Sequence, residues 1–357
     1  MPARATEGTC LAKLVRLAIP LCKTAQSQRP RTGPGQRPEY DDWKMAVMIM
    51  AATLKRRKSK SAQYRFLCEH HRKLRRWLGL KRFPARSTYF SRYPRLYRLF
   101  EVAIALQARQ ALCEGVTTAR SVAADKSLLS ARGKPWHGKR RIRVKDPPRP
   151  GVDRQADWGF SPYHEWVYGY SYEVVTTAEK GTVHLPLVAS AGVASASEHK
   201  TLGPKIDFLP PKTRFVLADS GYDDIALGER VERDRQGRPT GRRFVCPPNR
   251  RGGSERPSQN PHRSRPEQEA RRRRWKRIAF YQSPRGQKLY VLRTASVEPL
   301  HERLKSLFDM DRAVWHRGLG NTQTQLLGVI FCYQLLLRYN HRCGRHNAQV
   351  QWILESL

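Results

Sequence analysis

The segment "TRFVLAD", residues 213–219, ends a short apolar run on a carboxylate, and the turn residues "SGYDD" follow it. A short apolar run bounded by turn residues is typical of a buried strand. Because an unpaired carboxylate is unfavourable in an apolar interior, Asp219 must be solvated, paired with a cation or bound to a ligand. A second acid, Asp125, lies inside another apolar run, "SVAADKSLL". Any fold of this chain therefore has to place acids on two of its core strands.

The pattern around these segments predicts an α/β domain. "HEWVYGYSYEVVTT" alternates between apolar and small or polar residues, which is typical of a strand, and "TVHLPLVASAGV" predicts a partner strand. A helix is predicted over 196–207 and a second one in "DDIALGERVERD", while "RRFVCPP" predicts a fifth strand. The sequence therefore predicts a mixed five-stranded sheet flanked by helices, in which the first strand lies beside the fourth.

The N-terminal part of the chain has a different pattern. Residues 1–40 are rich in Pro, Gly, Arg and Gln, so we expect a poorly ordered basic extension, although "LAKLVRLAIPLC" fits a small amphipathic helix. Residues 41–115 show helical periodicity with Arg and Tyr between the apolar positions. Several short basic helices suit a DNA-binding domain, and an ordinary helical packing domain is the alternative.

The charge of the chain points to a polyanionic partner. Lys and Arg number 68 against 30 Asp and Glu, a formal net charge of +38. A field of this strength attracts nucleic acid. No membrane association is expected, because the apolar stretch at 325–340 is too short and too polar to span a bilayer. The seven cysteines are scattered singly, which favours a reducing cytoplasm over a disulfide framework.

Two further segments complete the predicted organisation. Residues 249–277 are of low complexity and basic, and we expect a solvated, flexible insertion. Its cationic run would grip DNA phosphates, as would the basic loop that follows the first strand. The run consists of Arg271, Arg272, Arg273 and Arg274. Residues 341–357 are predicted to form a C-terminal tail.

The two strand acids predict a metal site. In open α/β sheets, ligands bind at the carboxyl ends of strands where the strand order reverses. Asp125 and Asp219 would face each other there, and two bare carboxylates repel unless a cation lies between them. Mg²⁺ prefers a few carboxylates together with waters and phosphate oxygens. We therefore expect two Mg²⁺ ions, for which Mn²⁺ would substitute, in a site suited to phosphoryl transfer.

A third carboxylate is predicted in "VEPLHERLK", residues 297–305. Glu298, His301 or Glu302, and Lys305 would share one helical face. Because Pro299 is tolerated only near a helix start, we expect the helix to begin there, after a short strand in "KLYVL". Glu298 is then the predicted third acid and Glu302 the alternative, while Lys305 would reach a phosphate.

Three segments together, "AADKSLL", "LADSGYDD" and "YVLRTASVEPLHERLK", resemble the DDE-type transposases of bacterial insertion sequences. The resemblance covers roughly residues 40–340 and implies a ribonuclease-H-like catalytic domain over 116–340. It also implies the following residue roles. The catalytic and metal-binding acids would be Asp125, Asp219 and Glu298, and the DNA-backbone ligands would be Tyr290, Arg293 and Lys305.

The function that the resemblance implies is DNA transposition. The protein would bind the terminal inverted repeats of its own element, cut the DNA and join it to a target, as a homodimer on double-stranded DNA at the bacterial nucleoid. A catalytically inactive DNA-binding protein derived from a transposase is the main alternative. An RNA-binding structural protein would also satisfy the charge, but the ordered acids argue against it.

Overall fold

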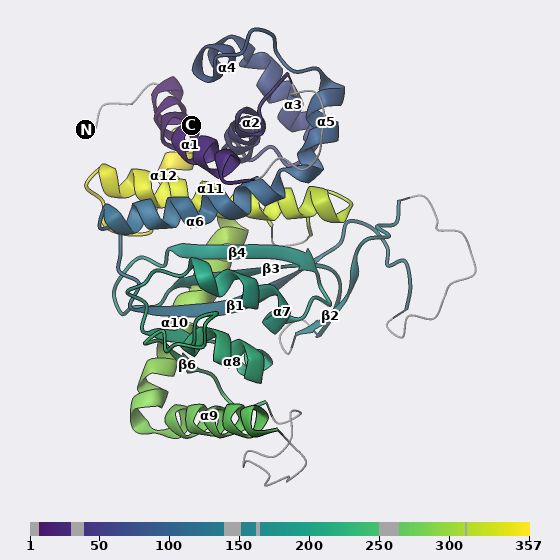
Figure 1. Ribbon diagram of the computed structural model, residues 1–357. Helices are drawn as coiled ribbons and strands as arrows, with labels where there is room; N and C mark the ends of the chain where they lie inside the picture. The colour runs from purple at the N-terminus through teal and green to yellow at the C-terminus, as the bar shows by residue number, and fades with distance from the viewer. Residues whose placement is uncertain (1–6, 30–38, 139–150, 162–164, 250–263, 311–312) are drawn as a thin grey trace.

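The computed structural model describes residues 7–29, 39–138, 151–161, 165–249, 264–310 and 313–357. The N-terminal helices form one end of the molecule, two long helices lie below them, and a β-sheet follows (Figure 1). The helices α8 (Ile225–Glu232) and α9 (Arg265–Gln282) form the other end.

The sheet is mixed and has six strands. These are β1 (Ser121–Ser130), β2 (Asp157–Ser161), β3 (Glu165–Thr177), β4 (Pro186–Val193), β5 (Phe215–Leu217) and β6 (Arg243–Val245). The strand order is β2-β3-β1-β5-β6, and β4 also pairs with β3. β1 is antiparallel to β3 and parallel to β5, and β5 is parallel to β6. The expected mixed sheet, with the first strand beside the "TRFVLAD" strand, is confirmed.

One strand was missing from the prediction. β2 does not appear among the five predicted strands, and it pairs antiparallel with the first residues of β3. Its residues alternate poorly between buried and exposed positions, and Phe160 is 53% exposed. A strand without a buried face gives no period-2 signal, so only its backbone pairing reveals it.

The N-terminal helices surround one apolar core. They are α1 (Glu7–Ser27), α2 (Asp42–Leu54), α3 (Lys60–Glu69), α4 (His71–Leu78), α5 (Arg86–Arg92) and α6 (Tyr97–Cys113), with the 3₁₀ helix η1 (Tyr93–Arg95) before α6. The expectation of a poorly ordered extension is wrong for α1, which buries Leu14, Val15 and Ala18. Apolar residues three and four apart give α1 a face that must be covered, and α2 and α6 cover it. Residues 1–6 and 30–38 lie outside the described residues.

Two long helices connect this end of the chain to the sheet. α11 (Leu319–Arg342) is buried over most of its length and packs against α6, α2 and β4. α6 also packs against β4, and the short α12 (Gln351–Glu355) lies near the C-terminus. The N-terminal helices and the sheet therefore share one continuous hydrophobic core.

The remaining helices follow the later strands. They are α7 (Glu198–Leu202), α8 (Ile225–Glu232), α9 (Arg265–Gln282) and α10 (Pro284–Leu307), with the 3₁₀ helices η2 (Gly203–Phe208) and η3 (Ser220–Tyr222). The helix predicted over 196–207 is thus α7 continued by η2. The prediction of a flexible insertion is wrong for 265–277, which belong to α9. A capping box of Ser264 and Glu267 begins this helix.

The segment that was expected to change from strand to helix is helical throughout. α10 begins at Pro284, where the Ser283 side chain accepts a hydrogen bond from the backbone of Gly286, and Pro299 lies inside the helix. The short run "KLYVL" fits a strand or a buried helical turn equally well, and its packing partner decides between them. α10 packs against β1, β3 and β5, with Val297 and Leu300 buried.

Candidate active site

The sheet register sets Asp125 and Asp219 side by side. Ala123 of β1 pairs with Leu217 of β5 in parallel. Asp125 and Asp219 each follow that pair by two residues, so they are level on adjacent strands. The Asp125 side chain is 17% exposed and the Asp219 side chain is 39% exposed. The predicted juxtaposition of the two acids is present in the structure.

Arg293 of α10 bridges the two carboxylates. Its Nη2 lies 2.6 Å from Asp125 Oδ1 and 3.4 Å from Asp219 Oδ2. Burial raises the pKa of Asp219, and the charge of Asp125 raises it further against the opposing effect of Arg293. Sequence analysis assigned Arg293 to the DNA backbone. In this structure its guanidinium neutralises the acid pair instead.

His301 lies about two turns after Arg293 in α10, and it also contacts Asp125. Its Nε2 lies 3.2 Å from Asp125 Oδ2, and its Nδ1 lies 3.0 Å from the Tyr172 hydroxyl. Burial favours the neutral form of Asp125, but His301 and Arg293 outweigh it and lower the pKa of that carboxyl. Sequence analysis placed His301 on one helical face with Glu298 and Lys305 and gave it no role in the acid site. Its eight-residue spacing from Arg293 is informative only once the helix is known to be continuous.

The other signature residues of α10 lie around this contact. Glu298 and Glu302 are both exposed, and no contact among the described residues joins either of them to Asp125 or Asp219. Tyr290 is half-buried against Tyr281, and burial raises the pKa of its hydroxyl to about 12. Lys305 is half-buried near the C-terminal end of the helix.

A further acid, absent from the sequence prediction, lies beside Asp219. Glu198 is the first residue of α7, and its Oε1 is 4.0 Å from the ammonium of Lys126. Burial and the neighbouring Asp219 raise the pKa of Glu198. The sequence contains no signal for it, because the loop that brings Glu198 to the sheet has no recognisable periodicity.

The acid pair has the chemistry of a divalent-cation site. Carboxylate oxygens are the ligands that Mg²⁺ prefers, and a cationic group, Arg293, already lies between Asp125 and Asp219. Over the part of the chain that the structure describes, no three His, Cys, Asp or Glu side chains are arranged as a metal site. The residues therefore fit such an ion in charge and donor type, with two acids in place and Arg293 as their present counter-ion.

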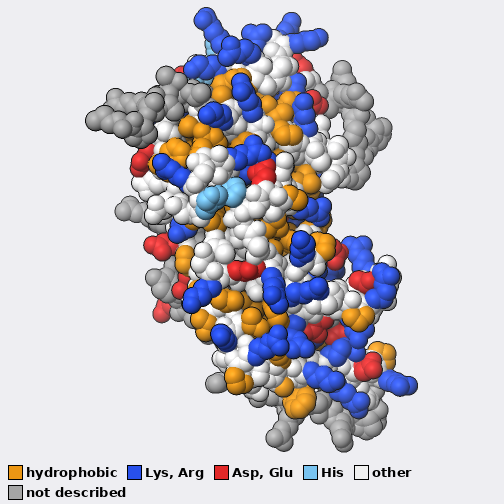
Figure 2. Space-filling view, turned by 90° about the vertical axis from the view of Figure 1, so that its left-hand side faces the viewer, with side chains coloured by type: hydrophobic (Ala, Val, Ile, Leu, Met, Phe, Trp, Pro, Cys, Tyr) orange, Lys and Arg blue, Asp and Glu red, His pale blue; other side chains and the backbone are white. Residues whose placement is uncertain are grey.

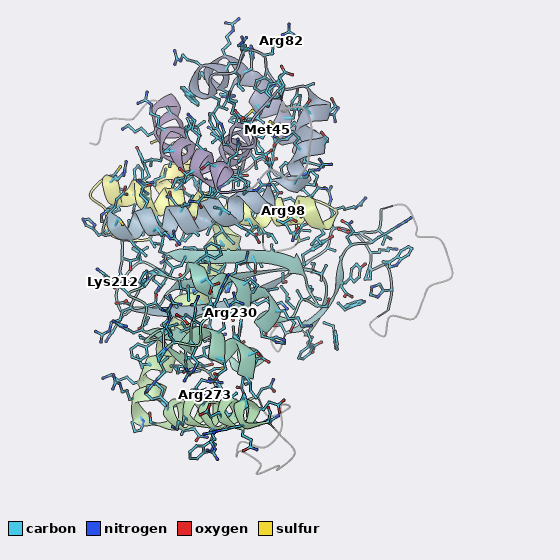
Figure 3. All side chains as sticks on the ribbon, in the orientation of Figure 1. Met45, Arg82, Arg98, Lys212, Arg230 and Arg273 are labelled. Atoms are coloured by element: carbon cyan, nitrogen blue, oxygen red, sulfur yellow. The ribbon has the colours of Figure 1, made fainter. Side chains whose placement is uncertain are left out.

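Cationic side chains cover much of the molecular surface. Lys and Arg occur from one end to the other of the face drawn in Figure 2, where acids are few. Figure 3 labels Arg82 among the N-terminal helices and Arg273 on α9, at opposite ends of the molecule. The exposed cations of the N-terminal helices and the turn after α4 include Arg72, Lys73, Arg75, Arg76, Lys81 and Arg82.

The arginine run of α9 is divided between internal ion pairs and solvent. Arg273 pairs with Glu229 at 2.7 Å, and Arg274 pairs with Asp223. Arg272 is exposed, and neither it nor Arg271 forms an ion pair with a described acid. An open cleft of about 330 Å³ beside α9 is lined mainly by the cations Arg233, Arg242, Arg243, Arg273, Lys276 and Arg277. Of the basic loop predicted after the first strand, residues 139–150 lie outside the described residues, as do residues 250–263.

The fold and the acid pair together define a mixed α/β protein with a candidate phosphoryl-transfer site at adjacent strands. The family model described as "Transposase DDE domain" matches residues 119–335, more than half of the chain. The chain therefore belongs to the transposase DDE domain family, as the sequence segments indicated.

Two other comparisons complete this picture. The structure of a piggyBac transposase synaptic complex with hairpin DNA is similar to this chain at 12% identity and a TM-score of 0.44, over 98% of this chain and 78% of that one. No curated protein sequence matches the chain. None of the described helices has the length and apolar character needed to cross a bilayer.

Proposed function

We propose that the protein is an active transposase that binds the ends of its own insertion sequence, cleaves DNA there and transfers the strand ends to a target. The observation that carries this proposal is the level placement of Asp125 and Asp219 on β1 and β5, with Arg293 between them. Two carboxylates on adjacent strands supply oxygen ligands of the kind that hold the ions of a metal-dependent phosphoryl transfer. The strand order is consistent with a ribonuclease-H-like catalytic domain.

Asp125, Asp219 and Glu298 would hold two Mg²⁺ or Mn²⁺ ions. When bound, such a pair of ions activates the attacking oxygen and stabilises the leaving oxygen of an in-line phosphate displacement. Glu298 is exposed on α10 and contacts neither aspartate, so it would join ions held by the two aspartates only after α10 rearranges on DNA. Glu302, one turn further along, is the alternative third acid.

The chain's other groups hold these acids in place and bind DNA. The His301 ring lies between Asp125 and the Tyr172 hydroxyl, which fixes the orientation of the carboxylate. Arg293 would release the aspartates for the ions and bind a DNA phosphate, for which its planar guanidinium is suited. Tyr290 and Lys305, on the same helix, would bind the backbone next to it.

DNA recognition would be divided along the molecule. Residues 41–115 would bind the terminal repeats, and residues 116–340 would form the catalytic domain, with 341–357 as a tail. Within the basic insertion at 249–277, Arg271 and Arg272 would contact phosphates, while Arg273 and Arg274 reach DNA only by leaving their acidic partners. Because two element ends must be brought together, we propose a homodimer on DNA, acting at the bacterial nucleoid in the cytoplasm.

The test is cleavage of a supercoiled plasmid that carries the inverted repeats flanking this reading frame. Wild-type protein should nick it in Mg²⁺ or Mn²⁺, and Asp125→Ala and Asp219→Ala should not. Glu298→Gln and Glu302→Gln decide which glutamate is the third acid. Asp207→Asn is the control, because Asp207 forms surface ion pairs with Arg230 of α8 and with Arg235, which follows that helix. Equal cutting by wild type and both aspartate variants would refute the assignment.

One observation favours a second candidate, a DNA-binding protein without catalysis. In the described residues no third acid contacts Asp125 or Asp219 through α10, and an arginine occupies the space between them. A protein that shifts DNA carrying the repeats, but never nicks it in either metal, would establish that function.

A further inference from the structure

Glu198 and Asp219 border the same small space beside Gly221. A Cβ atom built on Gly221 would lie 2.1 Å from Glu198 Oε2 and 3.1 Å from Asp219 Oδ1. The two carboxylate oxygens are therefore no more than about 5 Å apart. Because Mg²⁺ contacts its oxygen ligands at roughly 2.1 Å, a small rotation of either side chain would let one ion contact both.

The position of Glu198 is set by β1, the strand that carries Asp125. Lys126 donates hydrogen bonds to the carbonyl oxygens of Ala194 at 3.0 Å and Ala196 at 2.7 Å. These residues immediately precede α7, so the Lys126 side chain ties the start of this helix to the site. The ammonium is also the nearest cation to the Glu198 carboxylate, at 4.0 Å. An acid that only needed a counter-ion would be expected at hydrogen-bond distance from it.

Buried polar groups lie behind Glu198. The Tyr222 side chain is completely buried, and its hydroxyl faces the Glu173 carboxylate. Burial raises the pKa of this hydroxyl, and the nearby carboxylates of Glu173, Asp125 and Glu198 raise it further. The Glu173 side chain is itself only 4% exposed, and the Ser190 hydroxyl donates to its Oε2 at 3.3 Å. The buried acid of this cluster thus has hydroxyl partners, whereas the Glu198 carboxylate faces Asp219 across Gly221.

We propose that Glu198 is a further catalytic residue that holds a divalent cation, Mg²⁺ or Mn²⁺, together with Asp219. This inference rests on the proposed function, because Asp219 must itself be a metal ligand. It adds an acid from α7 to the acids of β1, β5 and α10. Glu198 and Asp219 would hold one ion, and Asp125 and Asp219 would hold the other.

The probe is Mn²⁺ titrated into the full chain without DNA, followed by the loss of the free-ion electron paramagnetic resonance signal. Glu198→Gln keeps the shape of the side chain and removes its charge. It should weaken Mn²⁺ binding by roughly tenfold or more, the scale on which a lost ligand or its support acts. The matched control is Glu101→Gln, because Glu101 also faces a lysine, Lys205, and its side chain is 26% exposed against 28% for Glu198. Glu101→Gln should leave binding unchanged.

A second variant separates geometry from charge. Gly221→Ala keeps every acid, but its Cβ would occupy the position of Glu198 Oε2, the mobile end of a side chain that must then turn away. It should therefore weaken Mn²⁺ binding like Glu198→Gln while the thermal midpoint stays near that of wild type. If Glu198 only pairs with Lys126, both variants keep wild-type Mn²⁺ affinity, and the inference is overturned.

A third variant distinguishes this failure from failure of the proposed function. Asp219→Asn should abolish Mn²⁺ binding if the strand acids form a metal site at all. Loss in Asp219→Asn with full binding in Glu198→Gln would overturn the role of Glu198 and leave the proposed site intact. Wild-type Mn²⁺ binding in Glu198→Gln, Gly221→Ala and Asp219→Asn would overturn both proposals. Equal losses of binding in Glu198→Gln and in the Glu101→Gln control would overturn the role of Glu198.

Discussion

The ion pair between α6 and α11 provides the most quantitative stability prediction. Arg338 of α11, whose side chain is 2% exposed, donates from Nε to Glu114 Oε2 at 2.6 Å and a second time from Nη2 to Oε1. Arg342 donates to the same carboxylate at 2.6 Å, and Arg338 Nη1 also reaches Gln107 at 3.2 Å. The pair thus joins the C-terminal ends of the two helices between the N-terminal core and the sheet. Glu114→Gln keeps the shape and removes the charge.

The size of the effect follows from the pKa of Glu114. Burial raises it, but Arg338 and Arg342 outweigh burial and lower it from 4.5 to about 2. At 1.36 kcal/mol per pKa unit this difference corresponds to about 3 kcal/mol. The side chain of Glu114 is 21% exposed, so solvent screening reduces the expectation to about 2 kcal/mol. At an unfolding entropy of about 2.1 cal/mol/K per residue, that loss lowers the Tm of this 357-residue chain by about 3 °C.

The pH dependence distinguishes this cause from a general packing defect. A carboxylate whose pKa is lowered by folding stabilises the protein above its unfolded-state pKa, and this stabilisation is lost as pH falls toward the folded-state value. The gap between wild type and Glu114→Gln should therefore shrink to less than about half by pH 3. The measurement is thermal unfolding by circular dichroism at pH 7 and pH 3. A gap of equal size at both pH values would refute the reasoning. Arg342→Ala, at a side chain that is 46% exposed, is the control and should lower stability by less than about 1 kcal/mol.

Four further outcomes are expected. Chelation of divalent ions should abolish plasmid nicking, which Mn²⁺ restores, without weakening the gel shift on DNA carrying the repeats. Replacing the exposed Arg272 and Lys276 of α9 with Ala should weaken DNA binding for all sequences and reduce the salt slope by about 2, whereas Arg273→Ala should mainly lower Tm, because Arg273 pairs with Glu229. Pro299→Ala should raise the free energy of unfolding by roughly 1–3 kcal/mol, because it restores a hydrogen bond inside α10. Burial, with Lys60 and Arg132 nearby, lowers the pKa of His316 to about 3. The unfolded chain therefore binds a proton below about pH 6.5 that the folded chain does not. In wild type the free energy of unfolding should therefore fall from about pH 6.5 toward pH 3, and the titration of Glu114 adds to that fall below pH 4.5. Chemical denaturation of His316→Gln should show a smaller loss between pH 6.5 and pH 4.5.

The central sheet could be predicted because its signals are local. Asp125 and Asp219 each interrupt an apolar run, and β3 alternates along its length, so strand identity and the placement of the two acids follow from residue order. The helix predicted in "DDIALGERVERD" begins after Asp224, whose side chain accepts a hydrogen bond from the backbone of Leu227 at the start of α8. Each of these features depends on residues that are close together in the sequence.

The features that could not be predicted depend on distant partners. α9 is rich in cations and was taken as flexible, but Glu229 and Asp223, more than forty residues earlier, pair with Arg273 and Arg274. The contact of His301 with Asp125 requires a continuous α10, which Pro299 argued against. Glu198 reaches the site through a loop, and only the tertiary fold brings it to Gly221.

Arg293 connects the charge of the molecule to its proposed chemistry. A chain with a net charge of +38 attracts DNA at almost any surface. The two strand acids repel each other, so they need a local cation to stay close together and ionised. Arg293 supplies it in the absence of ions, at 2.6 Å from Asp125 and 3.4 Å from Asp219. In the proposed mechanism, ion binding would exchange one cation for another at the acids and free the Arg293 guanidinium, a group well suited to binding a phosphate. In the proposed mechanism the same residue would hold the acid pair before DNA binds and contact the backbone afterwards, so Arg293→Gln should lower both the thermal midpoint of the free protein and its affinity for DNA.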